Sequence, residues 1–180
     1  MLKSEIKKQE NIAEYIIYMW QLEDLLRAFQ FDMGLVRSNL IFPQSKDEAT
    51  QNAVEEWYEE FIHKMEIQGI KESGHLNELN DVMIEMLYLH NTLLNITKDK
   101  DYIKCFDEAV NLLKEFDSKS NNSSLNPVES CLRALYGKLL LKIQGKSISP
   151  ETEEAFQKFT KVLAVLSLKY KEMKSGAMTN

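Results

Sequence analysis

Apolar residues recur at every third or fourth position along nearly the whole chain, and only six glycines and three prolines interrupt them. This spacing puts apolar side chains on one face of an α-helix. It predicts an all-α protein, a compact multi-helix bundle of six main helices plus one short helix. A chain of 180 residues with 44% apolar residues also fits the usual size of one hydrophobic core. We therefore expect a single helical domain over residues 1–180.

Helix-breaking and helix-capping residues set the expected boundaries. Pro43 ends the short helix, a capping box from Ser45 to Glu48 opens the next one, and a proline at the first helical position opens each of the last two. The polar stretch SKSNNSSLNP at 118–127 predicts a flexible internal connection, and 172–180 is expected to form a disordered tail. The expected helices cover about 5–30, 33–41, 45–69, 74–95, 99–117, 127–145 and 150–171.

Composition limits the cellular setting and the partners. The two cysteines, Cys105 and Cys131, are too few for a disulfide framework and belong to no CxxC motif. The N-terminus lacks the apolar stretch of a secretory signal, and no apolar run approaches the ~20 residues that span a bilayer. We expect a cytoplasmic protein with no membrane contact. The net charge of -6 also argues against a nucleic-acid partner, because phosphate binding needs a positive surface.

The stretch YMWQLEDLLRAF at 18–29 places two carboxylates and an arginine among aromatic and aliphatic residues. Around a helix, Trp20, Glu23, Asp24 and Arg27 fall opposite the main apolar face, and both carboxylates lie within reach of Arg27. The cluster could be an acid/base pair tuned by the arginine, or an ion-pair cluster that anchors the helix. We favour anchoring, because a nearby cation lowers a carboxylate pKa, whereas a general acid at neutral pH needs a raised one. We expect another helix or another subunit to cover Trp20.

The three histidines raise the question of a metal site, since some helical bundles bind metal through Glu-x-x-His pairs. Glu60 and His63 have that spacing, but His63 projects away from the apolar stripe of its helix. His75 and His90 lie at opposite ends of one expected helix, about 22 Å apart, so they cannot share a metal. His90 continues an apolar stripe and is expected to be a hydrogen-bonded core residue. We therefore expect no metal site and no cofactor.

Gly137 lies inside the expected helix 127–145, where glycine costs ~1 kcal/mol relative to alanine. Ala134 and Gly137 fall on one side of this helix, and an apolar stripe falls on the other. Two apolar faces indicate a helix that is covered on both sides. The two small residues predict a close approach of another helix, from the same chain or from a partner. A ligand bound at this position is the alternative.

Charge is divided between the two halves of the chain. Residues 47–91 contain eleven acidic residues and two lysines, whereas residues 126–174 contain nine basic residues and five glutamates. Lys138, Lys142 and Lys146 recur at four-residue spacing and form a basic ridge that could meet the acidic ridge of the third expected helix. Ordinary solvated faces are the alternative, since isolated surface pairs contribute only ~0–1 kcal/mol each. The asymmetry points to head-to-tail or side-by-side association of chains.

Three segments carry a resemblance to a known family: NIAEYIIYMWQLEDLLRA at 11–28, the stretch from EWYEEF to NTLL at 56–94, and the stretch from CLRALYGK to SLKYK at 131–171. With them the chain resembles domain of unknown function 4924, an uncharacterised family of all-helical proteins from Bacteroides-type bacteria. The resemblance implies an all-α domain of about this length in a bacterial cytoplasm. It implies no activity, because the family offers no catalytic or ligand-binding residues to transfer.

The sequence contains no Gly-rich phosphate loop, GxSxG, HExxH or EF-hand motif. Together with the second apolar faces, this favours a non-catalytic interaction or assembly protein that forms homo-oligomers through a helical face. The competing hypothesis is a small-molecule- or metal-binding helical enzyme. Its candidate site residues, which serve equally as partner-binding candidates, are Trp20, Glu23, Asp24, Arg27, His90 and Gly137.

Overall fold

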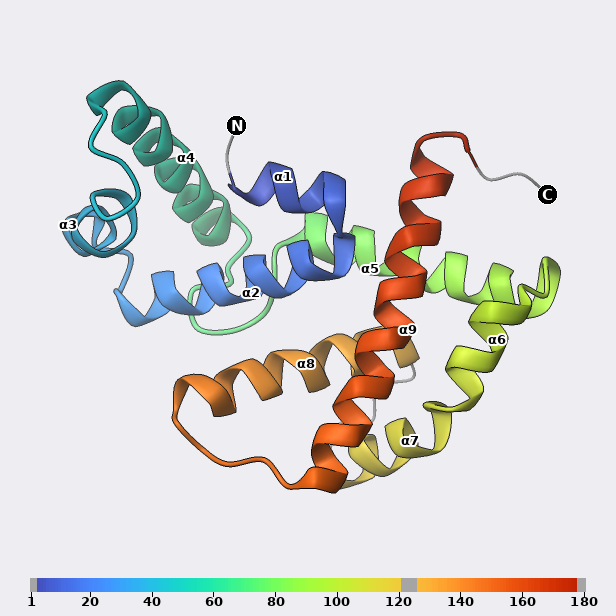
Figure 1. Ribbon diagram of the computed structural model, residues 1–180. Coiled ribbons are helices and arrows are strands. Elements are labelled where there is room, and N and C mark those ends of the chain that lie inside the picture. Colours follow the sequence, from blue (N-terminus) through green and yellow to red (C-terminus); the bar gives the residue numbers. More distant parts are fainter. Residues whose placement is uncertain (1–2, 121–125, 178–180) are drawn as a thin grey trace.

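The computed structural model describes residues 3–120 and 126–177, and all regular structure within these ranges is helical (Figure 1). The all-α prediction is confirmed. The described ranges hold nine α-helices, two of which continue into a π-helical turn. Their bounds are α1 Lys3–Glu10, α2 Ile12–Ala28, α3 Met33–Val36, η1 Arg37–Ile41, α4 Glu48–Ile67, α5 Asn77–Asn91, η2 Thr92–Ile96, α6 Lys100–Asp107, α7 Val110–Lys119, α8 Pro127–Ile143 and α9 Pro150–Lys174.

The helix count differs from the predicted six main helices plus one short helix because two expected helices are divided. The helix expected at 5–30 breaks at Asn11, whose side chain accepts hydrogen bonds from the backbone N–H groups of Ala13 and Glu14 and so starts α2. The helix expected at 99–117 breaks at Glu108 and Ala109, between α6 and α7. The cap of α4 also differs from the predicted one.

Asp47, and not Ser45, caps α4. Its carboxylate accepts a hydrogen bond from the backbone N–H of Thr50 at 2.8 Å. The predicted capping box therefore begins two residues too early. The starts of α8 and α9, each with proline in the first turn, agree with the prediction.

Two segments predicted to lack regular structure are partly helical. Helix α7 continues to Lys119, inside the connection expected at 118–127, and α9 continues to Lys174, inside the tail expected at 172–180. Residues 121–125 and 178–180 of these two segments lie outside the described residues.

Helix α9 occupies the centre of the fold. It crosses α2 and α8 at a steep angle and also lies against α5, α6 and α7 (Figure 1). Helices α2 and α8 contact each other as well as α9. Helix α4 stands to one side, next to α3 and η1.

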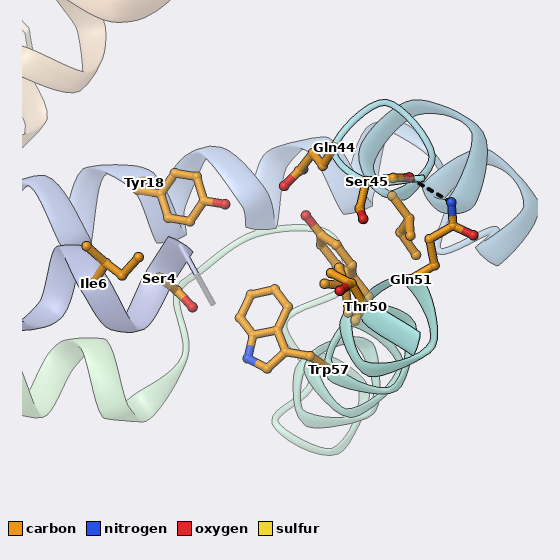
Figure 2. Close-up of a pocket in the computed structure, with 11 residues that line it drawn as sticks. Ser4, Ile6, Tyr18, Gln44, Ser45, Thr50, Gln51 and Trp57 are labelled. Carbon is orange, nitrogen blue, oxygen red and sulfur yellow. Dashed lines mark hydrogen bonds between the residues drawn. The ribbon is translucent and has the colours of Figure 1, made fainter. Parts of the chain in front are cut away.

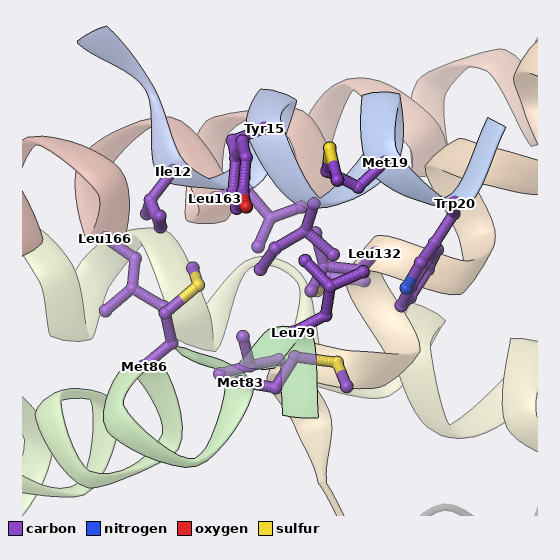
Figure 3. Packing of buried hydrophobic residues seen from close by; sticks show 14 of the residues in the cluster. Ile12, Tyr15, Met19, Trp20, Leu79, Met83, Met86, Leu132, Leu163 and Leu166 are labelled. Atoms are coloured by element: carbon purple, nitrogen blue, oxygen red, sulfur yellow. The ribbon is translucent and has the colours of Figure 1, made fainter. Parts of the chain in front are cut away.

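The densest part of the core lies where α2, α5, α8 and α9 meet. Figure 3 shows Met19 and Trp20 of α2 with Leu79 of α5 and Leu132 of α8. None of these four side chains is more than 3% exposed. Burial of a side chain of this size contributes roughly 1.5–3 kcal/mol. Contacts among these helices therefore dominate the stability of the fold.

Both cysteines are buried and unpaired, as expected for small apolar residues of helices. Burial raises the pKa of the Cys105 and Cys131 thiols. A raised pKa keeps a thiol protonated, so neither cysteine is prepared to act as a nucleophile.

Candidate functional site

The second face of α2 is buried at three residues and open to solvent at Asp24. Ile16, Trp20 and Glu23 are 0–1% exposed, which confirms that another part of the protein covers Trp20. The Asp24 side chain is 50% exposed. The opposite face is less well covered at Tyr18 and Leu25, which are half-buried. Glu23 therefore lies deeper than the periodicity of α2 indicates.

Glu23 binds the connection between α4 and α5. One carboxylate oxygen accepts a hydrogen bond from the backbone N–H of Leu76 at 2.9 Å. The other lies 2.6 Å from Nδ1 of His75, which donates to it. Glu23 does not pair with Arg27, contrary to the prediction, because the α4–α5 connection occupies the space beside its carboxylate.

Trp20 packs between two other residues of this region. Its indole ring stacks on the His75 imidazole with ring centres 4.5 Å apart, and the edge of Tyr136 from α8 approaches it at 5.8 Å. The indole N–H is buried and has no acceptor among the described residues. The ring thus joins α2, the α4–α5 connection and α8 through packing alone.

Arg27 fastens the same connection further along α2. It forms an ion pair with Asp24 at 2.8 Å, as predicted. Its remaining N–H groups donate to the carbonyl oxygens of Ile70 and Gly74. These two carbonyl oxygens lie between α4 and α5, where no helix supplies a hydrogen-bond donor, so the arginine satisfies them.

Tyr136 completes the cluster from α8. Its hydroxyl donates a hydrogen bond to the second carboxylate oxygen of Asp24. Burial raises the pKa of Tyr136, and the bond to Asp24 raises it further, so the phenol remains a donor. We call this set the α2 clamp; its members are Trp20, Glu23, Asp24, Arg27, His75 and Tyr136.

The α2 clamp contains the parts of a proton-transfer site but not its geometry. A carboxylate that orients an imidazole, as Glu23 does for His75, is typical of a general base. However, the imidazole is covered by Trp20 on one face, and within the described residues no hydroxyl, thiol or amine hydrogen-bonds to it. All four carboxylate oxygens of Glu23 and Asp24 are already engaged.

His90 lies outside the α2 clamp. It is 3% exposed, hydrogen-bonds through Nδ1 to the hydroxyl of Tyr102 at 2.6 Å, and contacts the edge of Phe106. The expectation of a hydrogen-bonded core histidine is confirmed. His90 contacts Tyr102 and Phe106 of α6, whereas the Trp20 ring contacts His75 and Tyr136, so these two candidate site residues have different ring neighbours.

Gly137 does not mediate a close approach of helices. Ala134 is fully buried, but a Cβ built on Gly137 would meet nothing within 4 Å. The predicted close contact with another helix of the same chain is therefore wrong at this position. Coverage of α8 on both sides ends before Gly137, about midway along the helix.

The described residues contain neither a metal-binding cluster nor a helix suited to span a membrane. No group of three or more His, Cys, Asp or Glu side chains there could hold a metal ion. His63 is exposed on the outer side of α4, as predicted. Within the same ranges, no helix combines the length and the apolar character needed to cross a bilayer.

Sequence reasoning missed two members of the α2 clamp as site residues. Tyr136 and His75 each contact Trp20 from segments more than fifty positions away in the chain. No local pattern encodes such a contact. Two signals were available: an aromatic residue beside an interior glycine in α8, and a histidine directly after Gly74.

These observations define an all-α protein whose buried polar cluster ties a helix connection and α8 to α2. The chain belongs to the family described as Domain of unknown function (DUF4924), whose family model matches residues 1–177. Neither the curated proteins nor the solved structures contained a match to this chain. The family description carries no activity, so functional inference rests on the geometry.

Proposed function

We propose that this protein is a non-catalytic interaction protein that assembles with further copies of itself. One observation supports this proposal most strongly. Every residue of α8 from Leu135 to Leu141 is only half-buried, and Ile143 is 62% exposed. This half of the helix is rich in leucine, so it presents partly exposed apolar side chains, and apolar surface of this kind is typical of interaction sites.

Charge favours a second copy as the occupant of this surface. The α8 face, which consists of Leu139, Lys142 and Ile143 at the end of α8 and Lys146 just beyond it, carries two lysines without an ion-pair partner in the described ranges. The α4 face, which consists of Glu56, Glu59, Glu60 and Ile67, carries three exposed glutamates that are likewise unpaired among the described residues. Each face also presents an exposed isoleucine, 62% for Ile143 and 71% for Ile67.

The two faces are complementary, and the proposed contact is therefore head-to-tail. A symmetric pairing of two α8 faces would bring lysines together, whereas α8 against α4 joins lysines with glutamates. Head-to-tail contacts form a closed ring or an open chain. Because the charged groups are exposed, added salt is expected to weaken the association.

The α2 clamp supports this choice over the alternative, a small-molecule- or metal-dependent enzyme with a site near Trp20, Glu23, Asp24, Arg27 and His90. Its carboxylates and its arginine bind other parts of the chain, and His90 lies apart from them. Because these carboxylates and this arginine already bind the chain itself, they are not free to bind a substrate. Its contacts instead fix the orientation of α8, which presents the proposed interface.

Light scattering over a range of protein concentrations tests the proposal. We expect a mass above 21.0 kDa that rises with concentration and falls on addition of 0.5 M NaCl. The variant Ile143→Glu should be a monomer, whereas Leu168→Glu, at a position 56% exposed on α9, should assemble like the native chain. A native protein that stays monomeric at millimolar concentration would overturn the proposal.

A further inference from the structure

A cavity of about 230 Å³ lies under α4, on the side opposite the α4 face, and is bordered by α1, α2 and η1 (Figure 2). Aromatic side chains form much of its wall: Trp57 and Tyr58 from α4 and Tyr18 from α2. None of the described residues that line it is charged. The volume equals that of about eight water molecules at ~30 Å³ each, enough for a one-ring molecule.

Neutral hydrogen-bonding groups line the cavity together with these aromatic rings. Tyr58 is 2% exposed, and its hydroxyl forms no hydrogen bond with the other described residues. Burial raises the pKa of Tyr58, so the phenol is a donor at neutral pH. The Trp57 indole N–H and the Ser4 hydroxyl are two further donors that no described residue accepts from.

Gln44 supplies an acceptor. Its amide nitrogen donates to the carbonyl of Leu40, which leaves the side-chain oxygen to accept. Figure 2 shows this oxygen on the side of Gln44 that faces Tyr18. Gln51 is held differently, since its amide nitrogen donates to the Ser45 carbonyl at 2.7 Å along the dashed line of Figure 2.

We propose that this cavity binds small neutral molecules that combine one ring with a hydroxyl or carboxamide group. The ring would lie among Trp57, Tyr58 and Tyr18, and the polar group would accept from Tyr58 or Trp57 and donate to Gln44. Concave sites with an apolar wall and a few convergent polar groups are typical of ligand binding. Charged analogues should be excluded, because the described lining offers no counter-ion to offset their desolvation.

Two tryptophans make the test specific. Trp57 lines the cavity, whereas Trp20 lies in the α2 clamp and is 1% exposed, so their two indole N–H resonances report on different places. The Trp57→Phe variant assigns them. We expect benzyl alcohol and benzamide at millimolar concentration to shift the Trp57 resonance alone. Benzoate and benzylammonium should bind at least tenfold more weakly.

Variants locate the site independently of the tryptophan signals. Tyr58→Phe should weaken benzamide binding about fivefold and leave toluene binding unchanged, since only the hydroxyl is lost. Val54→Trp should fill the cavity and abolish binding, and Ala53→Trp, on an exposed position next to it, should not.

Three results would overturn the proposal: no shift with either neutral compound, equal shifts of both tryptophans, or equal binding of benzoate. If Val54→Trp does not fold, the Tyr58→Phe comparison alone decides. Self-association is measured separately by light scattering, so failure of one proposal leaves the other intact.

Discussion

Among the three histidines, His90 is the most deeply buried. It is 3% exposed, and burial lowers its pKa from the ordinary value of 6.5 to about 4. Above pH 6.5 it is neutral in both the folded and the unfolded chain. Between pH 6.5 and 4 only the unfolded chain takes up the proton, so stability falls as the pH falls through this range.

Replacing His90 should remove this pH dependence. Between pH 6.5 and 5 the native protein is expected to lose about 2 kcal/mol of unfolding free energy through this residue. His90→Gln keeps a hydrogen-bonding group near Tyr102 but cannot titrate. Urea unfolding of both proteins at several pH values measures the difference, and parallel pH profiles would contradict the prediction.

A second prediction for a single residue concerns Gly137 and the free energy of unfolding. It lies within a helix, and an added Cβ meets open space. Gly137→Ala should therefore raise the unfolding free energy by about 0.5–1 kcal/mol. Gly145, just after α8, has φ +67, so Gly145→Ala should destabilise. Thermal unfolding of the two variants should shift in opposite directions.

The burial and the partners of individual side chains were partly predictable from the sequence. The apolar neighbours of His90 at helical spacing indicated its burial correctly. Glu23 was assigned to Arg27 because only partners on the same helix can be read from spacing. Its true partners, His75 and Leu76, come from a connection whose path depends on the packing of α4 and α5.

At the scale of elements, the α4–α5 connection shows how a segment without helical hydrogen bonds is held. Arg27 donates to the carbonyls of Ile70 and Gly74, and Glu23 accepts from Leu76. These bonds replace those that a helix would make internally. The connection is therefore expected to depend on α2 for its order.

Arg27→Lys should loosen this connection without unfolding the protein. A lysine has one ammonium group and cannot reach both carbonyls and Asp24 in the fork geometry of a guanidinium. We expect a stability loss of about 1–2 kcal/mol. Amide hydrogen exchange should accelerate at 70–77 and remain unchanged in α9.

Arg133→Lys is the matched control. Among the described residues Arg133 pairs only with Glu129 on its own helix, one turn away, so its replacement should alter neither region. Equal exchange at 70–77 in the native protein and in Arg27→Lys would contradict the role assigned to the α2 clamp.

Helix boundaries were predictable where a side chain marks them. The start of α2 carries such a signal, Asn11 followed by Glu14, which the continuous apolar pattern across the break obscured. The break before α7 carries none, because Ala109 has no side chain that can cap. Its position follows from packing against other helices.

At the scale of the whole molecule, the difference in charge between the two halves of the chain appears on two solvent-exposed surfaces, the α4 face and the α8 face. Six of the eleven acidic residues of 47–91 lie on α4, and Lys138 and Lys142 lie on α8. The sequence predicted these ridges, but not that α4 would lie to one side with Glu56, Glu59 and Glu60 unpaired among the described residues. That arrangement depends on the α2–α4 path through α3 and η1.

Exchanging charge between the two faces tests the head-to-tail contact directly. One variant carries Lys142→Glu and Lys146→Glu, and the other carries Glu59→Lys and Glu60→Lys. Each variant alone presents like charges on both faces and should be monomeric. An equal mixture restores opposite charges at the contact and should assemble.

Sedimentation velocity of the two variants, separately and mixed, is the most direct measurement of the central claim. The account predicts 21.0 kDa species for each variant alone and larger species only in the mixture. Assembly of either variant by itself to the native extent, or a mixture that stays monomeric, would contradict it.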